Sequence, residues 1–161
     1  MRVIEAQRIG EGSSGVNGGQ VIPGLKYDPA WLIADMGAQA GNRLADFVAG
    51  GADRVFDLIQ SEALAVPHRR NGWIQTAARQ TALQTARARA QQWQARGVLA
   101  EVLDAGRIAA LTGARGYLGG WFDPRAGVKT RANLVVSPSG RRGIKLTTQP
   151  KHKIRQAASW A

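Results

Sequence analysis

The segment 10–15 reads G-E-G-S-S-G and matches the phosphate-binding pattern G-x-G-x-x-G, with Asp35 lying 20 residues after its last glycine. Glycines let backbone N–H groups approach phosphate oxygens closely, and an acidic residue at about that distance binds a ribose hydroxyl in Rossmann folds. Those folds also need a helix directly after the glycines. Residues 16–20 contain two more glycines, and Pro23 follows, so no useful helix is expected here. We therefore reject a simple Rossmann site.

The same segment supports a different anion-binding interpretation. A short strand, Val3-Ile4, ends at Glu5, and a loop rich in glycine and hydroxyl residues follows it. An acidic side chain at a strand end binds a ribose diol, and exposed loop N–H groups bind anionic oxygens. Ser14 and Asn17 add side-chain donors and acceptors. From the residues alone, an ordinary surface loop remains the alternative.

Three segments, in this order, resemble FAD-dependent oxidoreductases of the D-amino-acid-oxidase-like family. The first runs from V-I-E-A at residues 3–6 to the loop G-S-S-G-V-N-G-G-Q at residues 12–20. The second is R-R-N-G-W-I-Q-T-A at residues 69–77, and the third is Y-L-G-G-W-F-D-P-R-A-G at residues 117–127. The resemblance covers residues 2–127, and the most similar subgroup is that of the gamma-glutamylputrescine oxidoreductases.

This resemblance implies FAD as the cofactor and assigns roles to particular residues. Glu5 resembles the ligand of the adenosine ribose, and Val16 replaces an arginine that is frequent in the family. The loop along the flavin nucleotide would comprise Gly12, Ser13, Ser14, Gly15, Asn17, Gly18, Gly19 and Gln20. The substrate-side sheet would include Tyr117, Gly119, Gly120 and Trp121. The catalytic residues stay unknown.

The resemblance also implies an activity, the oxidation of a small amine or amino acid with hydride transfer to the flavin. The family's first strand and glycine turn would precede Glu5, and the likeness stops near Val128. We therefore expect an internal piece of such an enzyme that is inactive alone, self-associates and does not retain FAD through gel filtration. The substrate, the electron acceptor, the oligomeric state and a frameshift origin of the last residues stay open.

The fold class expected from this reading is α/β (α+β), helix-rich. It comprises an incomplete FAD/NAD(P)-binding Rossmann-like domain (1–62), part of a substrate-side domain (63–127) and a basic, disordered tail (128–161). Apolar spacing predicts one long helix from Asp28-Pro29 to about Ser61. Its apolar stripe would contain Leu44, Phe47, Val48, Val55, Leu58 and Ile59.

Shorter elements follow along the chain. Residues 76–96 form the clearest predicted helix, and Asp104 is expected to cap a further helix to Leu111. Strands are expected at Trp73-Ile74 and over residues 116–122, before the turn at 123–127. The buried face of the clearest helix would comprise Leu83, Ala86, Ala90 and Trp93.

Composition excludes several classes of function. The 161 residues are 44% hydrophobic and 20% charged, which are values typical of globular proteins. There is no cysteine, and His68 and His152 are the only histidines, so thiol chemistry is excluded and no metal site is expected. No apolar run reaches the length of a transmembrane helix, and the default expectation is a cytoplasmic protein. His68 is interpreted as a solvated loop residue.

The charge distribution supports an alternative function. The net charge is +11, and residues 128–161 contain eight Lys or Arg and no acidic residue. Residues 1–127 contain 14 Lys or Arg against 11 Asp or Glu. A small basic nucleic-acid-binding protein would bind non-specifically and with steep salt dependence, so no specific nucleic-acid partner is expected. Trp31, Trp73, Trp93 and Trp121 are interpreted as core or interface residues rather than base-stacking residues.

Overall fold

The computed structural model describes residues 2–5, 12–129 and 145–148. The chain divides into two compact units. The first unit combines residues 1–20, 56–68 and 128–161, and the second combines residues 21–55 and 69–127. The mixed α/β class and the helix-rich character expected from the sequence are confirmed.

The first unit contains short elements from distant parts of the chain. Strand β1 (Arg2–Glu5) pairs in parallel with β8 (Lys145–Thr148), and Val3 lies opposite Leu146. The strand expected at Val3-Ile4 is therefore present, and the structure gives it a partner strand within this chain. Helix α1 (Ser13–Val16) is a single turn.

A second sheet has three short strands. It consists of β2 (Gln20–Val21), β7 (Gly127–Lys129) and β3 (His68–Arg69), in the order β2-β7-β3. The sequence predicted a disordered tail over residues 128–161. Strand β7 overlaps the start of this segment and β8 lies within it. The other residues of the segment lie outside the described part of the chain. The division into a FAD-binding part, a substrate-side part and a tail stays a prediction.

The long helix expected over residues 28–61 is divided into three helices, which is a correction to the sequence interpretation. Helix α2 (Pro29–Met36) is followed by α3 (Ala38–Ala49) and α4 (Gly51–Ser61). Gly37 has a φ of 79°, which an α-helix cannot contain, and the chain changes direction there. The second division is at Gly50.

The new helix boundaries also change which residues of this region are buried. The expected stripe placed Phe47 and Leu58 on the apolar face, yet their exposed fractions are 72% and 42%. Ile59 is buried as expected. The buried apolar residues of α3 and α4 are Ala45, Ala52, Phe56 and Ile59.

Asp28 stands at the N-cap of α2, as expected, but its side chain does not cap the helix. Its carboxylate instead accepts a hydrogen bond from Arg89 Nε at 2.5 Å. The backbone N–H of Ala30 donates to Gln92 Oε1 at 2.9 Å, so a residue 62 positions away satisfies this end of the helix. Pro29 follows Asp28 at the first helical position, where its missing N–H costs nothing.

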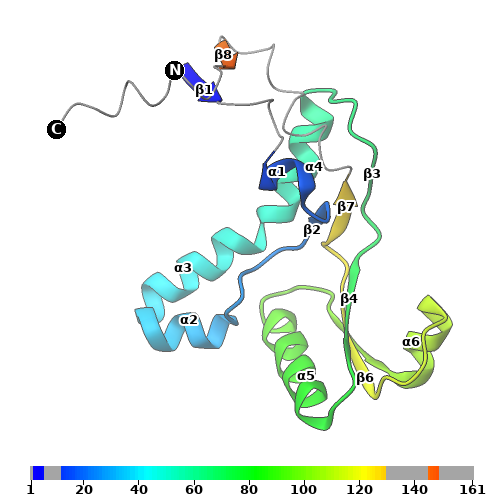
Figure 1. The fold of residues 1–161 in the computed structure, drawn as a ribbon. Coiled ribbons are helices and arrows are strands. Elements are labelled where there is room, and N and C mark those ends of the chain that lie inside the picture. Colours follow the sequence, from blue (N-terminus) through cyan, green and yellow to red (C-terminus); the bar gives the residue numbers. More distant parts are fainter. Residues whose placement is uncertain (1, 6–11, 130–144, 149–161) are drawn as a thin grey trace. The chain divides into compact units, whose positions relative to one another are not determined.

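The centre of the second unit is a three-stranded antiparallel sheet. Its strands are β4 (Trp73–Ala77), β6 (Gly119–Asp123) and β5 (Glu101–Asp104), in the order β4-β6-β5. Helix α5 (Gln80–Gln94) contacts β4 and β6, and α6 (Ala105–Thr112) lies on the other side of the sheet (Figure 1). The strands near Trp73 and after residue 116 were expected, whereas β5 was missed.

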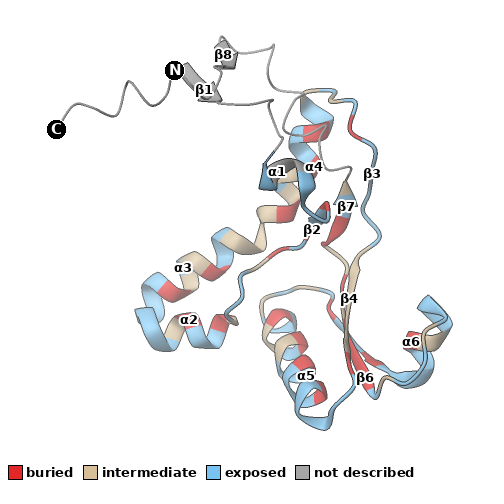
Figure 2. Ribbon diagram, in the orientation of Figure 1, coloured by how far each residue is buried: buried red, intermediate tan, exposed pale blue. Residues whose placement is uncertain are grey.

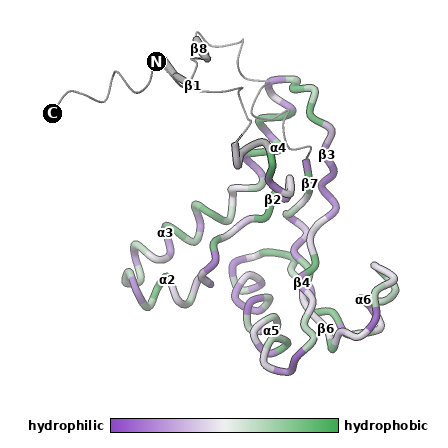
Figure 3. Tube along the Cα trace, in the orientation of Figure 1, coloured by the Kyte–Doolittle hydropathy of each residue, from purple (hydrophilic) through white to green (hydrophobic). Residues whose placement is uncertain are grey.

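Helix α5 packs on the sheet through the face that the sequence predicted. Leu83, Ala86, Ala90 and Trp93 are all buried, and three of them join Ala100 and Trp121 in one core cluster. Figure 2 shows buried segments, in red, alternating with exposed ones along α5. Figure 3 shows hydrophilic residues interleaved along the same helix, as an amphipathic surface helix requires.

Helix α6 confirms a capping prediction. Asp104 Oδ1 accepts a hydrogen bond from the backbone N–H of Arg107 at 2.7 Å, and the helix ends at Gly113 with a φ of 73°. Within the described residues, no helix is long and apolar enough to cross a membrane.

Gly41 sets how closely α2 and α3 approach each other, and this gives a first testable prediction. A Cβ at Gly41 would lie 2.5 Å from the carbonyl oxygen of Leu32 and 2.6 Å from Ile33 Cα. Because these are backbone atoms, Gly41→Ala must push the two helices apart, and we expect a loss of about 2 kcal/mol in the free energy of unfolding. Urea denaturation followed by far-UV circular dichroism measures it.

Gly51 is the matched control, because it is also helical and a Cβ there meets nothing within 4 Å. Gly51→Ala is expected to stabilise the protein by about 0.5–1 kcal/mol through the lower backbone entropy of the unfolded chain. Equal effects of the two substitutions would contradict the close packing of α2 on α3.

Candidate functional site

The loop over residues 12–20 is built around one helical turn and one side-chain turn. Residues 13–16 form α1, and Asn17 Oδ1 then accepts a hydrogen bond from the backbone N–H of Gly19 at 2.8 Å. Gly19 has a φ of 70°, so the turn needs a residue without a Cβ. Its carbonyl accepts a hydrogen bond from the N–H of Lys129 at 2.8 Å, which fixes the loop to β7.

The surface of this loop leaves its backbone accessible. Ser13, Asn17, Gly18 and Gln20 are exposed, whereas Gly19 is buried. A Cβ at Gly12 would meet nothing within 4 Å, and one at Gly18 would meet only Gln20 Cγ at 4.0 Å. Open space beside a glycine-rich backbone allows an anionic, elongated ligand such as a nucleotide to lie against it. The residues therefore fit the group that the sequence resemblance implies.

The other predicted cofactor and substrate residues occupy defined positions. Glu5 is the last residue of β1, opposite Thr148. Tyr117 is half-buried in the connection before β6, and Gly119, Gly120 and Trp121 belong to that strand. The loop with Glu5 belongs to the first compact unit and Tyr117 to Trp121 belong to the second. The cofactor and substrate roles of all these residues stay predictions.

A polar network in the core of the second unit was missed by the sequence interpretation. Trp121 Nε1 donates to Gln75 Oε1 at 2.9 Å, and Arg89 Nη1 donates to the same oxygen at 2.8 Å. Arg89 also pairs with Asp28, and Trp121 meets Trp73 edge-on, with ring centroids 5.9 Å apart. No local signal reveals this network, because its members come from the N-cap of α2, β4, α5 and β6.

A second buried ion pair lies in the turn after β6. Asp123 is fully buried, and its carboxylate accepts hydrogen bonds from the backbone N–H, Nε and Nη2 of Arg125, at 3.0, 3.0 and 2.6 Å. The Arg125 guanidinium lies 4.4 Å from the ring centroid of Trp93. The predicted turn at 123–127 is therefore held by charge, hydrogen bonds and a cation–π contact together.

The structure also shows the contacts of His68 and of the tryptophans that the sequence analysis considered. His68 is exposed on β3, its Nδ1 lies 2.9 Å from the carbonyl oxygen of Val66, and its ring lies 5.7 Å from that of Phe56. The core interpretation of Trp93 and Trp121 is confirmed. Trp31 is 45% exposed and stacks on Tyr27, with ring centroids 4.0 Å apart.

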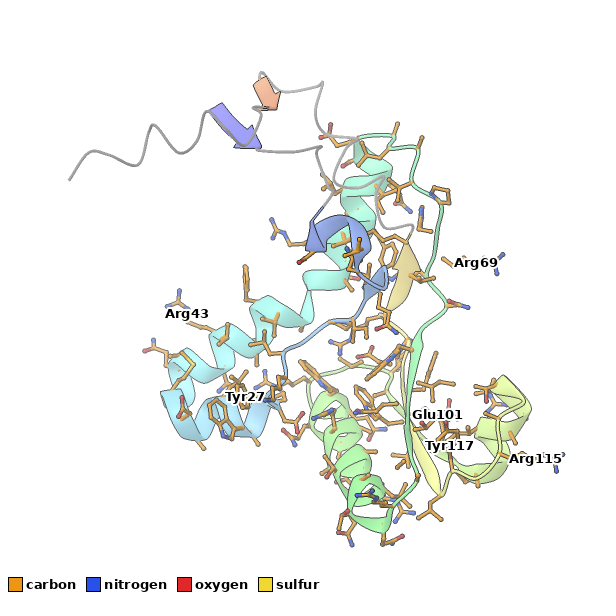
Figure 4. The ribbon with its side chains drawn as sticks, viewed as in Figure 1. Tyr27, Arg43, Arg69, Glu101, Arg115 and Tyr117 are labelled. Atoms are coloured by element: carbon orange, nitrogen blue, oxygen red, sulfur yellow. The ribbon has the colours of Figure 1, made fainter. Side chains whose placement is uncertain are left out.

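Among the cavities lined by described residues, two lie in the second unit. The smaller, of about 60 Å³, lies among Tyr27, Trp73, Trp93 and Trp121 beside the Asp28–Arg89 pair. The larger, of about 500 Å³, lies between the sheet and α6, and its lining includes Ile74, Glu101, Arg107, Leu111 and Phe122. Figure 4 labels Glu101 beside the sheet strands, with Arg115 extending outward from the loop after α6. The larger of these two cavities has the size typical of a small-molecule site.

Comparison with known proteins places the chain in a family. Residues 1–137 match the DAO family, described as FAD dependent oxidoreductase. Among solved structures, the fold is similar to that of glycine oxidase from Geobacillus kaustophilus, with a TM-score of 0.68 and 15% sequence identity over 91% of this chain. Glycine oxidase from Bacillus cereus ATCC 14579 gives a TM-score of 0.65 and 14% identity over 92% of this chain.

The chain spans 39% of the length of each of these glycine oxidases. No curated protein matches the sequence. The family match covers all three segments whose motifs suggested this resemblance, at residues 3–20, 69–77 and 117–127. This chain belongs to the DAO family of FAD-dependent oxidoreductases.

Proposed function

We propose that this chain provides part of an enzyme that oxidises an amine or an amino acid with FAD as the hydride acceptor. The observation that carries the proposal is the family match over residues 1–137, which contains the loop 12–20 with its accessible glycine backbone. FAD supplies the chemistry of accepting a hydride from a C–N carbon when it is bound. The alternative of a nucleic-acid-binding protein is not favoured by this match.

In this proposal the residues of the loop bind the nucleotide rather than react. The backbone of Gly18 and the side chains of Ser13, Asn17 and Gln20 would bind and orient FAD, and Glu5 would bind the ribose. The substrate would approach the strand that carries Gly119 to Trp121. The motifs at residues 12–20 and 117–127 support gamma-glutamylputrescine as the substrate, and the names of the two glycine oxidases support a small amino acid.

The test is a titration of the isotope-labelled 161-residue chain with FAD, followed by amide NMR. We expect weak binding that shifts the resonances of residues 12–20 and leaves those of the outer face of α5 unchanged. Asn17→Ala removes the acceptor of the Gly19 N–H, so it should weaken binding about tenfold, whereas Ser61→Ala should not. Shifts spread evenly over the chain would contradict the cofactor assignment.

The substrate class is tested by binding, because the chain is expected to be inactive alone. Glycine or gamma-glutamylputrescine should shift the amide resonances of residues 117–121 in the FAD-loaded sample, whereas the matched alcohols should not. Equal shifts with the amines and the alcohols would contradict the proposed substrate class.

A further inference from the structure

We propose that Asn17 is a site of spontaneous covalent modification, at which its side-chain amide becomes a carboxylate through attack by the backbone nitrogen of Gly18. The chain contains four asparagines, and two of them, Asn17 and Asn71, are followed by glycine. A following glycine favours this reaction, because the absence of a Cβ leaves the backbone nitrogen accessible to the asparagine side chain. The sequence does not distinguish the two sites, whereas the structure does.

The reaction has two steps and needs only water as a co-reactant. In the first step, the Gly18 nitrogen forms a bond to Cγ of Asn17 while the bond from Cγ to Nδ2 breaks. The proton of the Gly18 N–H passes through solvent to the leaving Nδ2, so that ammonia departs and a cyclic imide remains. In the second step, water opens the imide at one of its two carbonyl groups. The product is aspartate or, where the backbone now runs through Cγ, isoaspartate.

A hydrogen bond from Gly19 favours the first step at Asn17. Negative charge develops on Oδ1 when Cγ is attacked, because the side-chain carbonyl becomes tetrahedral. The backbone N–H of Gly19 already donates to this oxygen at 2.8 Å. Gly19 is itself held in place, since its carbonyl accepts a hydrogen bond from the N–H of Lys129 at 2.8 Å. A fixed donor at the oxygen that gains charge lowers the barrier, as in an oxyanion hole.

The attacking nitrogen of Gly18 lies in an open part of the loop. Asn17 and Gly18 are both exposed. The nearest atom to a Cβ at Gly18 would be Gln20 Cγ, at 4.0 Å, so neighbouring atoms do not crowd this position. Water also reaches an exposed site freely, which the second step requires. Both steps are therefore sterically possible without unfolding the loop.

The second Asn-Gly pair, just before β4, has a different environment. The N–H of Gly72 donates to the carbonyl oxygen of Ala126 at 3.0 Å, so its nitrogen must first give up this hydrogen bond. A Cβ at Gly72 would overlap the ring of Phe122 and would lie 3.0 Å from the carbonyl oxygen of Asp123. Backbone packed this closely cannot rotate easily to bring its nitrogen to the Asn71 side chain. We therefore expect Asn71 to react slowly in the folded chain.

The test incubates the 161-residue chain without flavin in mildly alkaline buffer and follows both sites by mass spectrometry. Brief trypsin digestion separates them, because Asn17 falls in the peptide 9–26 and Asn71 in the peptide 71–79. Conversion of an amide to an acid raises the peptide mass, and an isoaspartate-specific methyltransferase detects the rearranged product. We expect Asn17 to react about tenfold faster than Asn71. In concentrated urea, where neither environment persists, the two rates should agree within about threefold.

Two variants of the same loop separate the attacking nitrogen from general changes in the loop. Gly18→Ala places a Cβ beside the attacking nitrogen, so it should slow the reaction at Asn17 about tenfold and leave Asn71 unchanged. Gly12→Ala is the matched control, because a Cβ there meets nothing within 4 Å, and it should change neither rate. Circular dichroism verifies that both variants fold.

Two outcomes would overturn the inference. Asn71 could react as fast as Asn17 in the folded chain, or the ratio of the two rates could be the same in urea as in buffer. Either result would show that the surroundings of Asn17 do not promote the reaction.

The modification also has a consequence for the cofactor, which rests on the proposed function. A carboxylate at position 17 would repel the anionic nucleotide that this function assigns to the loop. Asn17→Asp should therefore weaken FAD binding about tenfold, although it keeps an acceptor for the Gly19 N–H. Unchanged FAD binding would contradict the cofactor assignment and leave the two reaction rates unaffected, so the two proposals fail by separate measurements.

Discussion

Gly120→Ala is expected to lower the free energy of unfolding by about 3 kcal/mol and the melting temperature by about 10 °C. A Cβ at Gly120 would overlap the carbonyl oxygen of Gln75 and would lie 3.1 Å from Thr76 Cα. Both are backbone atoms of β4, the strand paired with β6 at this point. Backbone in a paired strand cannot move aside without breaking ladder hydrogen bonds, so the strain is not relieved cheaply.

Thermal unfolding followed by circular dichroism measures this loss, and Gly106→Ala is the control. Gly106 lies in α6, and the nearest atom to a Cβ there is Asp104 Oδ1 at 3.4 Å, an ordinary contact. The control is expected to be neutral or slightly stabilising, because alanine favours a helix over glycine. A melting temperature of Gly120→Ala within two degrees or so of the unaltered protein would contradict the described pairing of β4 with β6.

Asp123→Ala is expected to cost about 3–5 kcal/mol, because it leaves the Arg125 guanidinium without its buried partner. Asp123 is fully buried and receives three hydrogen bonds from Arg125, one of them from the backbone. The same substitution frees the guanidinium from its place over Trp93. The near-UV circular dichroism of the tryptophans should therefore weaken together with the stability.

Asp123→Asn separates charge from hydrogen bonding, since the amide oxygen can still accept the backbone N–H of Arg125. We expect it to retain part of the stability that Asp123→Ala loses. Asp46→Ala is the exposed control, because Asp46 pairs with Arg96 but is 70% exposed, and its loss should cost at most about 1 kcal/mol. Urea midpoints for the three variants measure the difference. Equal midpoints for Asp123→Ala and Asp46→Ala would show that the buried pair does not stabilise the turn.

The sequence by itself determined the features that depend on local spacing. The 3-4-3 spacing from Leu83 to Trp93 places apolar residues on one face of a helix, and this face is buried against the sheet. The Asp104 cap is a hydrogen bond from the backbone N–H of Arg107, which is three residues further along the chain. The turn at 123–127 is held by a hydrogen bond from Arg125 to Asp123, two residues apart. Interactions this short in sequence are encoded by residue type alone.

The loop over residues 12–20 is a similar case. Asn17 and Gly19 are two residues apart, and their types allow the side-chain turn that the structure contains. The family also followed from the sequence, because glycine patterns at residues 12–20 and 117–127 retain their order and spacing. What the loop binds could not be derived from the residues alone, since short polar side chains also suit an ordinary surface loop.

Only the tertiary structure decided where the expected long helix is interrupted and what the polar side chains bind. Glycine has a low helix propensity, so Gly37 and Gly50 are both positions where a helix is easily interrupted. The packing of α2 on α3 at Gly41 requires the chain to reverse direction at Gly37. Asp28 is an N-cap by local rules, yet Arg89, 61 residues away, takes its carboxylate. Strand register likewise decides which side chains of β4, β5 and β6 share a face of the sheet, and register depends on contacts between residues that are distant in the sequence.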